Sequence, residues 1–132
     1  MNKPHPIDKN LLKLVIVVEG DSSLRISMVN YLMLFGYTVT GAGSAYDFYR
    51  QVFTEPYAVA IIDHDLSDQN GLVVAEYAKK NTAMRIITLS DPISFTTLPD
   101  QLKSGADLNL VKPVDFRLLA ACVTSLFSRI GS

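Results

Sequence analysis

The stretch I-I-D-H-D-L-S-D-Q-N-G, residues 61–71, is the most informative part of the chain about the fold, because it joins the end of a strand, an acidic loop and the start of a helix. Its first residues complete the apolar run Tyr57–Ile62, which is typical of a strand buried on both faces. Polar residues follow at once, beginning with Asp63 and Asp65. The segment Leu72–Lys80 beyond them has the apolar spacing of a helix. These residues predict one unit of strand, loop and helix.

The same succession of strand and helix runs through the whole chain. Apolar and β-branched stretches predict four further strands at Leu14–Val18, Tyr37–Thr40, Arg85–Leu89 and Leu108–Val111. Helical spacing predicts further helices near 24–35, 44–53, 94–104 and 115–130. Pro99 lies inside the third of these helices and weakens it. Five strands, each followed by a helix, predict an α/β protein with a parallel sheet covered on both sides.

The composition indicates one soluble domain. The chain has 132 residues, 48% of them hydrophobic, which suits a single domain with its own core. Its 12 Lys and Arg residues against 13 Asp and Glu exclude a protein held on nucleic acid by overall charge. No apolar run approaches the ~20 residues that span a bilayer, and Cys122 is the only cysteine. We therefore expect a soluble, cytoplasmic protein.

Polar residues follow four of the predicted strands at the point where each strand ends. They are Glu19-Gly20-Asp21, Asp63-His64-Asp65, Ser90-Asp91 and Lys112-Pro113. Ligands bind outside the carboxyl ends of the strands in open α/β sheets, so these groups are expected to converge. Carboxylates ~4 Å apart repel by roughly 4 kcal/mol at an effective dielectric near 20, which invites a hard cation such as Mg²⁺. A lysine and a serine beside such a cation could bind the oxygens of a phosphoryl group, and one carboxylate could attack it as the nucleophile. The pattern therefore indicates phosphorylation of an aspartate.

Two segments carry a resemblance to a known family. Residues 61–71, quoted above, and S-G-A-D-L-N-L-V-K-P, residues 104–113, resemble the receiver domain of bacterial two-component response regulators. The likeness extends over residues 12–130 and leaves residues 1–11 as a polar lead-in. It implies a doubly wound, flavodoxin-like (βα)5 fold, with a parallel sheet in the order 2-1-3-4-5 and helices on both faces.

The resemblance also implies roles for individual residues. Asp63 would be the phosphoacceptor, and Ser90 and Lys112 would contact the phosphoryl group. Mg²⁺ would be held by Glu19, by Asp63 and by the backbone carbonyl of Asp65. The donor would be a phosphohistidine on a histidine kinase or phosphotransfer protein. The domain would catalyse only its own phosphorylation and dephosphorylation, and would not otherwise be an enzyme.

The metal site departs from the receiver family at one position. Gly20 replaces the second of two adjacent acids, so one metal ligand is missing and a weakened Mg²⁺ affinity is expected. The side chain of Asp65 is a candidate substitute for the lost ligand. Asp21 is a further candidate ligand, although we expect it to cap the helix that follows.

Two other departures concern the phosphoryl group and the switch. Asp91 stands where the family prefers Ala or Gly, and it should repel an incoming phosphoryl group. Asn109 replaces the family's switch aromatic, so it cannot couple to the Ser90 hydroxyl in the usual way. Two functions stay open, a phosphorylated receiver with altered signalling and a phosphate-independent pseudo-receiver that acts through protein contacts. The sequence retains Asp63, Ser90 and Lys112, which favours the phosphorylated receiver.

Two other classes of protein fit parts of this sequence. Asp63-His64-Asp65 matches the D-x-D motif of haloacid-dehalogenase-type phosphatases, which also form an aspartyl phosphate. Those enzymes carry the motif on their first strand, whereas here it lies in the middle of the chain. A flavodoxin-like FMN-binding protein needs a phosphate loop after the first strand, where the acids of Glu19-Gly20-Asp21 would repel a phosphate. Both classes are therefore disfavoured.

The last helix and the charge distribution indicate which partners to expect. The outer face of this helix is expected to hold Leu118, Ala121, Cys122 and Ser125. A face with so little charge suits a homodimer through the last helix. No basic stripe is present, so direct binding of nucleic acid by this domain is not expected, and neither is membrane binding. We expect an output domain to be absent from this chain or to be a separate protein.

Overall fold

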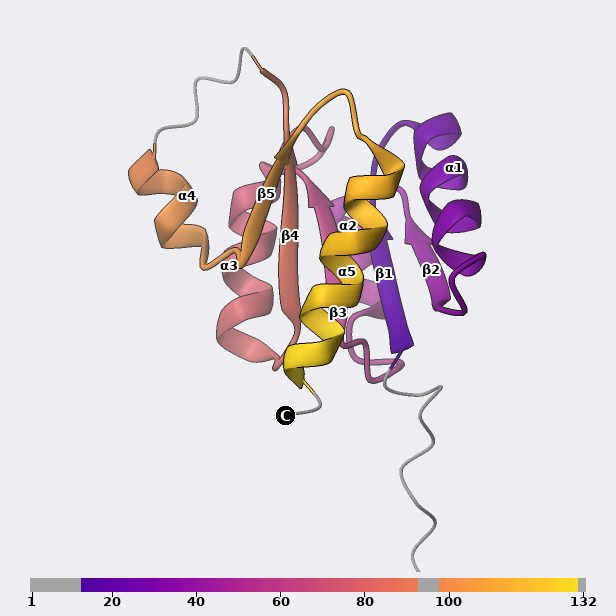
Figure 1. Ribbon diagram of the computed structural model, residues 1–132. Coiled ribbons are helices and arrows are strands. Elements are labelled where there is room, and N and C mark those ends of the chain that lie inside the picture. Colours follow the sequence, from indigo (N-terminus) through magenta and orange to yellow (C-terminus); the bar gives the residue numbers. More distant parts are fainter. Residues whose placement is uncertain (1–12, 93–97, 131–132) are drawn as a thin grey trace, which may run out of the picture.

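The computed structural model describes residues 13–92 and 98–130, which form a five-stranded parallel sheet with helices on both faces (Figure 1). The strands lie in the order β2-β1-β3-β4-β5, so the expected doubly wound fold is confirmed. The strands are β1 Leu14–Val18, β2 Thr38–Ala42, β3 Val59–Asp63, β4 Arg85–Ser90 and β5 Leu108–Val111. The helices are α1 Ser22–Met33, α2 Ala45–Gln51, α3 Gly71–Asn81, α4 Leu98–Ser104 and α5 Phe116–Ile130.

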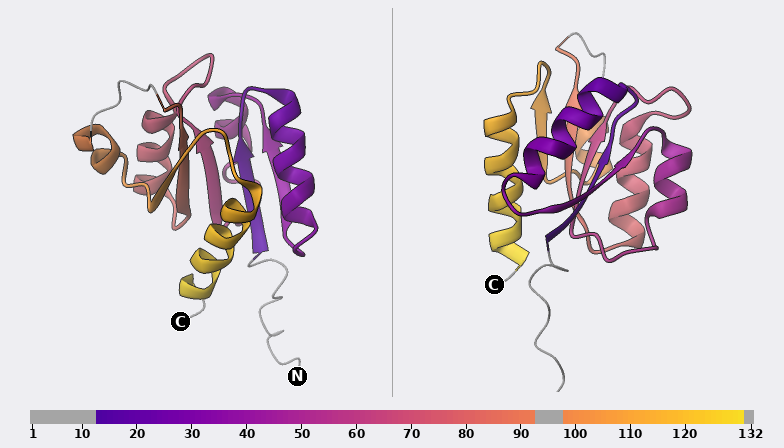
Figure 2. Two further views of the ribbon diagram at one scale, coloured as in Figure 1. Left: turned by 45° about the horizontal axis from the view of Figure 1, so that its top comes forward. Right: turned by 90° about the vertical axis from the view of Figure 1, so that its right-hand side faces the viewer.

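The sheet separates two hydrophobic cores. Figure 2 shows α1 and α5 on one face of the sheet and α2 and α3 on the other, and α4 lies beside α3. Val15 and Ile61 belong to the core under α1 and α5, whereas Ile16 and Ile62 belong to the core under α2 and α3. This division follows from the alternation of side chains along a strand. Every residue of β1 and β3 is buried, as their continuous apolar runs predict.

Three strands, β2, β3 and β4, reach further along the chain than the sequence indicates, and β4 does so by one residue, Ser90. Apolar and β-branched residues predict the second strand at Tyr37–Thr40, but β2 extends to Ala42. Gly41 and Ala42 have low strand propensity, and they lie in the sheet because they pair with the end of β1. β3 likewise includes Asp63, which is the last residue of the strand rather than the first of the loop.

Two predictions fall on residues outside the described ranges. One is the polar lead-in over residues 1–11, so the domain boundary stays a prediction. The other is the start of the helix expected at 94–104, since residues 93–97 are not described and α4 covers Leu98–Ser104. Pro99 therefore stands in the first helical turn, where its missing N–H leaves no helix hydrogen bond unmade. No helix within 13–92 and 98–130 has the length and apolar character needed to cross a membrane.

Helix α5 covers the sheet with a broader face than the sequence indicates. Its buried residues are Leu119, Ala120, Val123 and Leu126. The prediction that Cys122 lies on the outer face is wrong, because this residue is half-buried and packs against the core under α1 and α5. The exposed face of α5 is therefore narrower than predicted.

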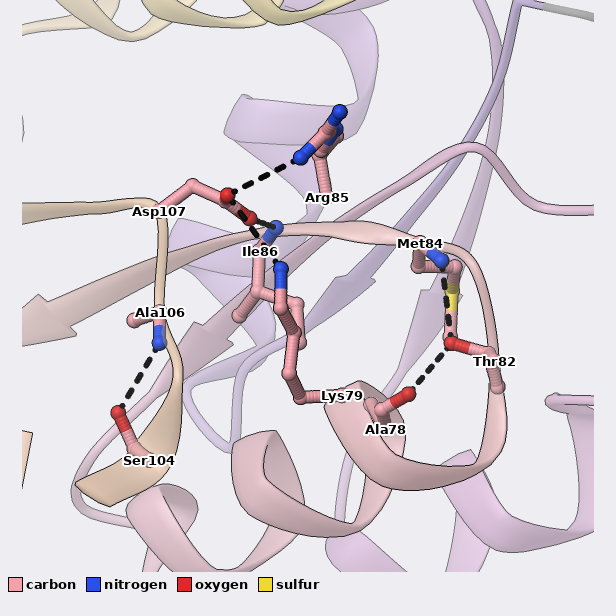
Figure 3. A network of polar contacts seen from close by, with 9 residues as sticks. All are labelled: Ala78, Lys79, Thr82, Met84, Arg85, Ile86, Ser104, Ala106 and Asp107. Carbon is pink, nitrogen blue, oxygen red and sulfur yellow. Dashed lines mark hydrogen bonds and ion pairs between the residues drawn. The ribbon is translucent and has the colours of Figure 1, made fainter. Parts of the chain in front are cut away.

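A polar network holds the start of β4 beside the start of β5 (Figure 3). Asp107, directly before β5, accepts a hydrogen bond from the backbone N–H of Ile86 at 2.7 Å. Its other carboxylate oxygen lies 3.5 Å from Nζ of Lys79 and 3.6 Å from Nη1 of Arg85. The Asp107 carboxylate therefore fixes where the edge strand β5 begins. That strand leads directly to Lys112.

Gly71 lets α3 begin directly against the end of β3. Asn70 caps the helix by accepting a hydrogen bond from the N–H of Leu72 at 2.8 Å, and the N–H of Gly71 donates to the carbonyl of His64 at 2.9 Å. A Cβ added to Gly71 would collide with the backbone carbonyl of Asp63 and would lie 2.8 Å from Cα of His64. Only a residue without a side chain permits this close approach.

Gly71→Ala should therefore destabilise the fold by about 1–3 kcal/mol, the usual cost of overpacking. The measurement is the free energy of unfolding from urea titration. Gly20→Ala is the matched control, because its Cβ would meet only the carbonyl oxygen of Gly43, at an ordinary 3.8 Å. Equal stabilities for the two variants would contradict the steric account.

Candidate functional site

An open pocket of about 480 Å³ lies at the carboxyl ends of the strands. Glu19 follows β1, Asp63 ends β3 and Lys112 follows β5, so the parallel sheet gathers residues that are far apart in the sequence. The remaining lining comes from loop residues, which are Gly20, Asp21, Gly43, Asp65, Leu66 and Ser67. The predicted carboxylates and the predicted lysine therefore share one pocket.

Asp63 and Lys112 form an ion pair inside this pocket. Oδ2 of Asp63 lies 2.5 Å from Nζ of Lys112, and Oδ1 accepts a hydrogen bond from the backbone N–H of Asp65 at 2.9 Å. The side chain of Asp63 is 1% exposed. Burial favours a higher pKa for Asp63, but the hydrogen bonds with Glu19 and Lys112 outweigh burial and hold the pKa below its usual value. Asp63 is therefore ionised, as a nucleophilic carboxylate must be.

Glu19 supplies a second buried carboxyl group, with only 2% of the residue exposed. Its Oε1 accepts a hydrogen bond from the backbone N–H of Asp21 at 3.3 Å, whereas Oε2 is buried and accepts no hydrogen bond from any residue that the structure describes. Burial and the neighbouring carboxylate of Asp63 raise the pKa of Glu19 to about 8. A hydrogen bond between the two carboxyl groups therefore requires a proton on Glu19.

Arg25, which the sequence does not single out, fixes the loop that presents Glu19. Its Nη1 donates a hydrogen bond to the backbone carbonyl of Glu19 at 2.7 Å. The Arg25 side chain packs so close to β2 that a Cβ on Gly41 or Gly43 would lie 3.3 or 3.1 Å from it. These two glycines were the one sequence signal that could have indicated this packing.

The loop between β3 and α3 is anchored to α2. The carboxylate of Asp68 accepts hydrogen bonds from the backbone N–H groups of Ala45 and Tyr46, at 3.0 and 2.9 Å. The hydrogen bonds from Tyr46 and Ala45 lower the pKa of Asp68. The hydroxyl of Tyr49 donates to Oε1 of Gln69 at 2.7 Å. Both contacts restrain the loop that borders the pocket.

Ser90 ends β4 at the carboxyl edge of the sheet and is 3% exposed, but it is not among the residues that line the pocket. Its backbone carbonyl accepts a hydrogen bond from the N–H of Lys112 at 2.8 Å, which ties the two predicted phosphoryl contacts together. Its Oγ accepts a hydrogen bond from Nδ2 of Asn109 at 3.1 Å, and Oδ1 of Asn109 accepts one from Oγ1 of Thr88 at 2.8 Å. The predicted switch residues Ser90 and Asn109 are therefore in contact. Sequence reasoning missed Thr88, because one threonine inside a buried strand has no signal of its own.

Two further polar residues border the strand ends. His64 is 4% exposed, and neither ring nitrogen has a hydrogen-bond partner within residues 13–92 and 98–130. Burial lowers the pKa of His64, so the ring is uncharged at neutral pH. Asp91 is half-buried directly after β4, and its predicted repulsion of a phosphoryl group stays a prediction.

The pocket fits a divalent cation that takes few protein ligands. In the part of the chain that the structure describes, no three His, Cys, Asp or Glu side chains are grouped closely enough to hold a metal ion. Glu19 and Asp63 nevertheless present two neighbouring carboxyl groups, one of them with an unpartnered buried oxygen. Mg²⁺ usually takes one or two carboxylates and keeps several waters, so these residues suit it.

Asp21 and Gly20 account for the small number of ligands. Oδ1 of Asp21 accepts a hydrogen bond from the N–H of Leu24 at 3.1 Å, so the expectation that Asp21 caps α1 is confirmed. A role for Asp21 as a metal ligand stays a prediction, as does one for the side chain of Asp65, which is exposed at the pocket. Gly20 lines the pocket without a side chain to offer.

The sheet order and the acidic pocket around the Asp63–Lys112 ion pair define a flavodoxin-like α/β domain with a site at the carboxyl ends of its strands. The chain belongs to the response regulator receiver domain family, which matches residues 15–124. It is 25% identical over 116 residues to the TorCAD operon transcriptional regulatory protein TorR of Escherichia coli O157:H7, covering 88% of this chain and 50% of that protein. It is 29% identical over 107 residues to the regulatory protein VirG of Rhizobium rhizogenes, covering 80% and 44%. The chain thus spans about half the length of these relatives.

Solved structures agree with the family. A CheY-like response regulator receiver domain protein from Methanospirillum hungatei JF-1 matches with a TM-score of 0.79 and 25% identity, over 89% of this chain and 94% of that one. A two-component response regulator from Clostridium difficile matches with a TM-score of 0.84 over 91% and 99%, and at 21% identity that likeness concerns the fold. The predicted family is confirmed, and the domain is one used in two-component phosphorelay signalling.

Glu19→Gln should stabilise the metal-free protein, and more so at high pH. The pKa of Glu19 is about 8 in the folded protein against an ordinary 4.5, so the wild type binds an extra proton when folded. The stability that Glu19 contributes by binding this proton is fully present below its pKa in the unfolded chain, and it is lost as pH rises through its pKa in the folded protein. The uncharged amide avoids this loss, so Tm should rise by on the order of 5 °C at about pH 9 and by less at about pH 5.

Thermal unfolding in EDTA at both pH values measures this difference. Glu55→Gln is the control, because Glu55 is exposed and its replacement should leave Tm nearly unchanged. If Glu19→Gln shifts Tm by the same amount at both pH values, the buried carboxyl group is not the cause.

Proposed function

We propose that the chain is a working receiver, in which Asp63 accepts a phosphoryl group from a phosphohistidine of a histidine kinase or phosphotransfer protein in the cytoplasm. The observation that carries this proposal is the buried carboxyl group of Asp63, which lines an acidic pocket and lies 2.5 Å from Nζ of Lys112. Membership of the receiver family supports the same chemistry. The domain acts on itself only and turns over no separate substrate.

The residues of the pocket account for the steps of transfer. A carboxylate oxygen of Asp63 attacks phosphorus, the phosphorus–nitrogen bond of the donor breaks, and its electron pair stays on the imidazole. Lys112 already contacts Asp63, so its ammonium group is in reach of an oxygen on the arriving phosphoryl group. The hydroxyl of Ser90 would donate a hydrogen bond to a second oxygen of the phosphoryl group. The N–H of Asp65 keeps the Asp63 carboxylate oriented through its 2.9 Å hydrogen bond.

A bound Mg²⁺ would neutralise negative charge on the phosphoryl oxygens. Glu19 and Asp63 would hold it together with the backbone carbonyl of Asp65, and the Asp65 side chain would partly replace the missing acid. Because Gly20 offers no carboxylate, we expect the affinity for Mg²⁺ to be lower than a further acid would allow.

Phosphorylation would act by changing a protein-binding surface on this domain or on an output domain outside this chain. TorR and VirG are named as regulators, and this chain spans about half of each, so a transcriptional output is one form that the proposal takes. A homodimer through α5 stays a prediction that rests on its exposed outer residues, such as Leu118 at 50% exposure. Direct nucleic-acid binding by this domain is not part of the proposal.

The phosphate-independent alternative rests on the three atypical positions Gly20, Asp91 and Asn109. It is the function to which a failure of phosphorylation would point. The phosphatase alternative has less support, because Asp63 ends the third strand rather than the first, where the D-x-D motif of those enzymes lies.

Asp63→Asn should abolish phosphate uptake, because an amide cannot replace the attacking carboxylate. The protein is incubated with Mg²⁺ and a small phosphodonor, and intact mass is measured. Wild type should gain the mass of one phosphoryl group. Asp115→Asn, at an exposed position that caps α5, should gain it as well. No gain in wild type, together with no response to beryllofluoride, would contradict the proposal and favour the pseudo-receiver.

Gly20→Asp should raise the affinity for Mg²⁺ by on the order of tenfold, since it adds a carboxylate beside Glu19 and Asp63. The position has room, because a Cβ there meets only the carbonyl oxygen of Gly43 at 3.8 Å. Isothermal titration calorimetry measures the affinity. Gly20→Asn is the matched control, with the same size and no charge. Equal affinities for the two variants would rule out the missing acid as the reason for weak binding.

A further inference from the structure

Three polar side chains form a hydrogen-bonded chain on β4 and β5. Thr88 and Asn109 are paired across these two strands, and Ser90 lies two residues beyond Thr88 on the same face of the sheet. Oγ1 of Thr88 donates to Oδ1 of Asn109 at 2.8 Å, and Nδ2 of Asn109 donates to Oγ of Ser90 at 3.1 Å. Thr88 and Ser90 are 1% and 3% exposed, so water competes little for these bonds.

The direction of these bonds decides where the proton of the Ser90 hydroxyl goes. A hydroxyl has one proton to donate and two lone pairs to accept with. Because Ser90 accepts from Asn109, its own proton cannot point at that amide and is left for another acceptor. Thr88 holds the amide oxygen of Asn109, which keeps the amide nitrogen facing Ser90.

Asn109 lies further from the carboxyl edge of the sheet than Ser90 does. Ser90 is paired with Val111, the last residue of β5, so Asn109 lies two residues further from the carboxyl edge of the sheet. Ser90 is at that edge, and its carbonyl accepts a hydrogen bond from the N–H of Lys112 at 2.8 Å. A phosphoryl group on Asp63 would therefore meet the Ser90 hydroxyl and not the Asn109 amide.

We propose that Asn109, held by Thr88, is a positioning residue that aims the proton of the Ser90 hydroxyl at a phosphoryl oxygen on Asp63. The inference rests on the proposed function and adds to it two residues that set the hydroxyl in advance. An amide suits this task, because it bonds two hydroxyl groups at once, whereas the ring of Phe offers no donor or acceptor for either. Asn109 thus stands where the receiver family has its switch aromatic, and it offers Ser90 a hydrogen-bond donor that Thr88 holds in position.

The test is a double-mutant cycle between Ser90→Ala and Asn109→Leu. The rate constant for phosphorylation by a small phosphodonor is measured at saturating Mg²⁺ and donor, so that changes in binding do not enter. Each single variant should lower it by about three- to tenfold, the loss of one hydrogen bond. The double variant should be no slower than Ser90→Ala, because Asn109 acts through the hydroxyl that Ser90→Ala removes.

Two further variants separate positioning from packing. Thr88→Val deletes one hydroxyl at nearly constant shape and should slow phosphorylation in the wild type but not in the Ser90→Ala background. Asn109→Asp removes the donor and supplies an acceptor for the Ser90 proton, so it should be at least as slow as Asn109→Leu. Thr124→Val is the matched control. Thr124 lies on α5, and its hydroxyl contacts the hydroxyl of Tyr37 at 2.7 Å, so its loss should leave the phosphorylation rate unchanged. Circular dichroism confirms that each variant is folded.

The outcomes distinguish the inference from the function on which it rests. If wild type is phosphorylated but Asn109→Leu slows the reaction equally with and without Ser90, the positioning role is overturned and the receiver function stands. A wild-type rate in Asn109→Asp overturns it as well, and provides a second test if Asn109→Leu does not fold. If wild type takes up no phosphate, the proposed function fails and the inference fails with it.

Discussion

The ion pair between Asp63 and Lys112 is the interaction on which the pocket depends. It connects the end of β3 to the residue after β5, and it compensates for the burial of a carboxylate that is 1% exposed. Glu19 has no comparable partner in the part of the chain that the structure describes, where its Oε2 is buried without a donor, and burial beside Asp63 raises its pKa to about 8. One cation thus serves two buried carboxyl groups. That imbalance lowers the stability of the empty pocket, and it is what a divalent cation would relieve.

The surrounding fold keeps Glu19 and the loop after Asp63 at their positions. Glu19 is kept at its position by Arg25, which bonds the Glu19 carbonyl at 2.7 Å. The loop after Asp63 is restrained because the Asp68 carboxylate accepts hydrogen bonds from the first two N–H groups of α2. Helix α3 begins directly against the end of β3 because Gly71 has no side chain. Each restraint joins a loop to a different helix or strand. The charged groups therefore cannot separate without distorting the sheet ends, which favours ligand binding over relaxation.

The order of strands and helices and the main residues of the pocket could be predicted, because both depend on local signals. A buried strand such as Leu14–Val18 is a continuous apolar run, and a polar residue directly after it lies at the ligand-binding edge of the sheet. The contacts of Arg25 and Thr88 could not be predicted, since each depends on a partner from another element. The error at Cys122 has a similar origin: helical spacing alone does not show how widely the sheet and α1 cover α5.

A crystal structure with Mg²⁺ and beryllofluoride, a mimic of the phosphoryl group, tests most directly whether Asp63 is the phosphoacceptor. We predict beryllium bonded to an oxygen of Asp63, with Nζ of Lys112 and Oγ of Ser90 each on a fluorine atom. We also predict Mg²⁺ between Glu19 and Asp63. A pocket without beryllofluoride, with Lys112 still paired to Asp63, would contradict the account and leave the domain as a phosphate-independent module.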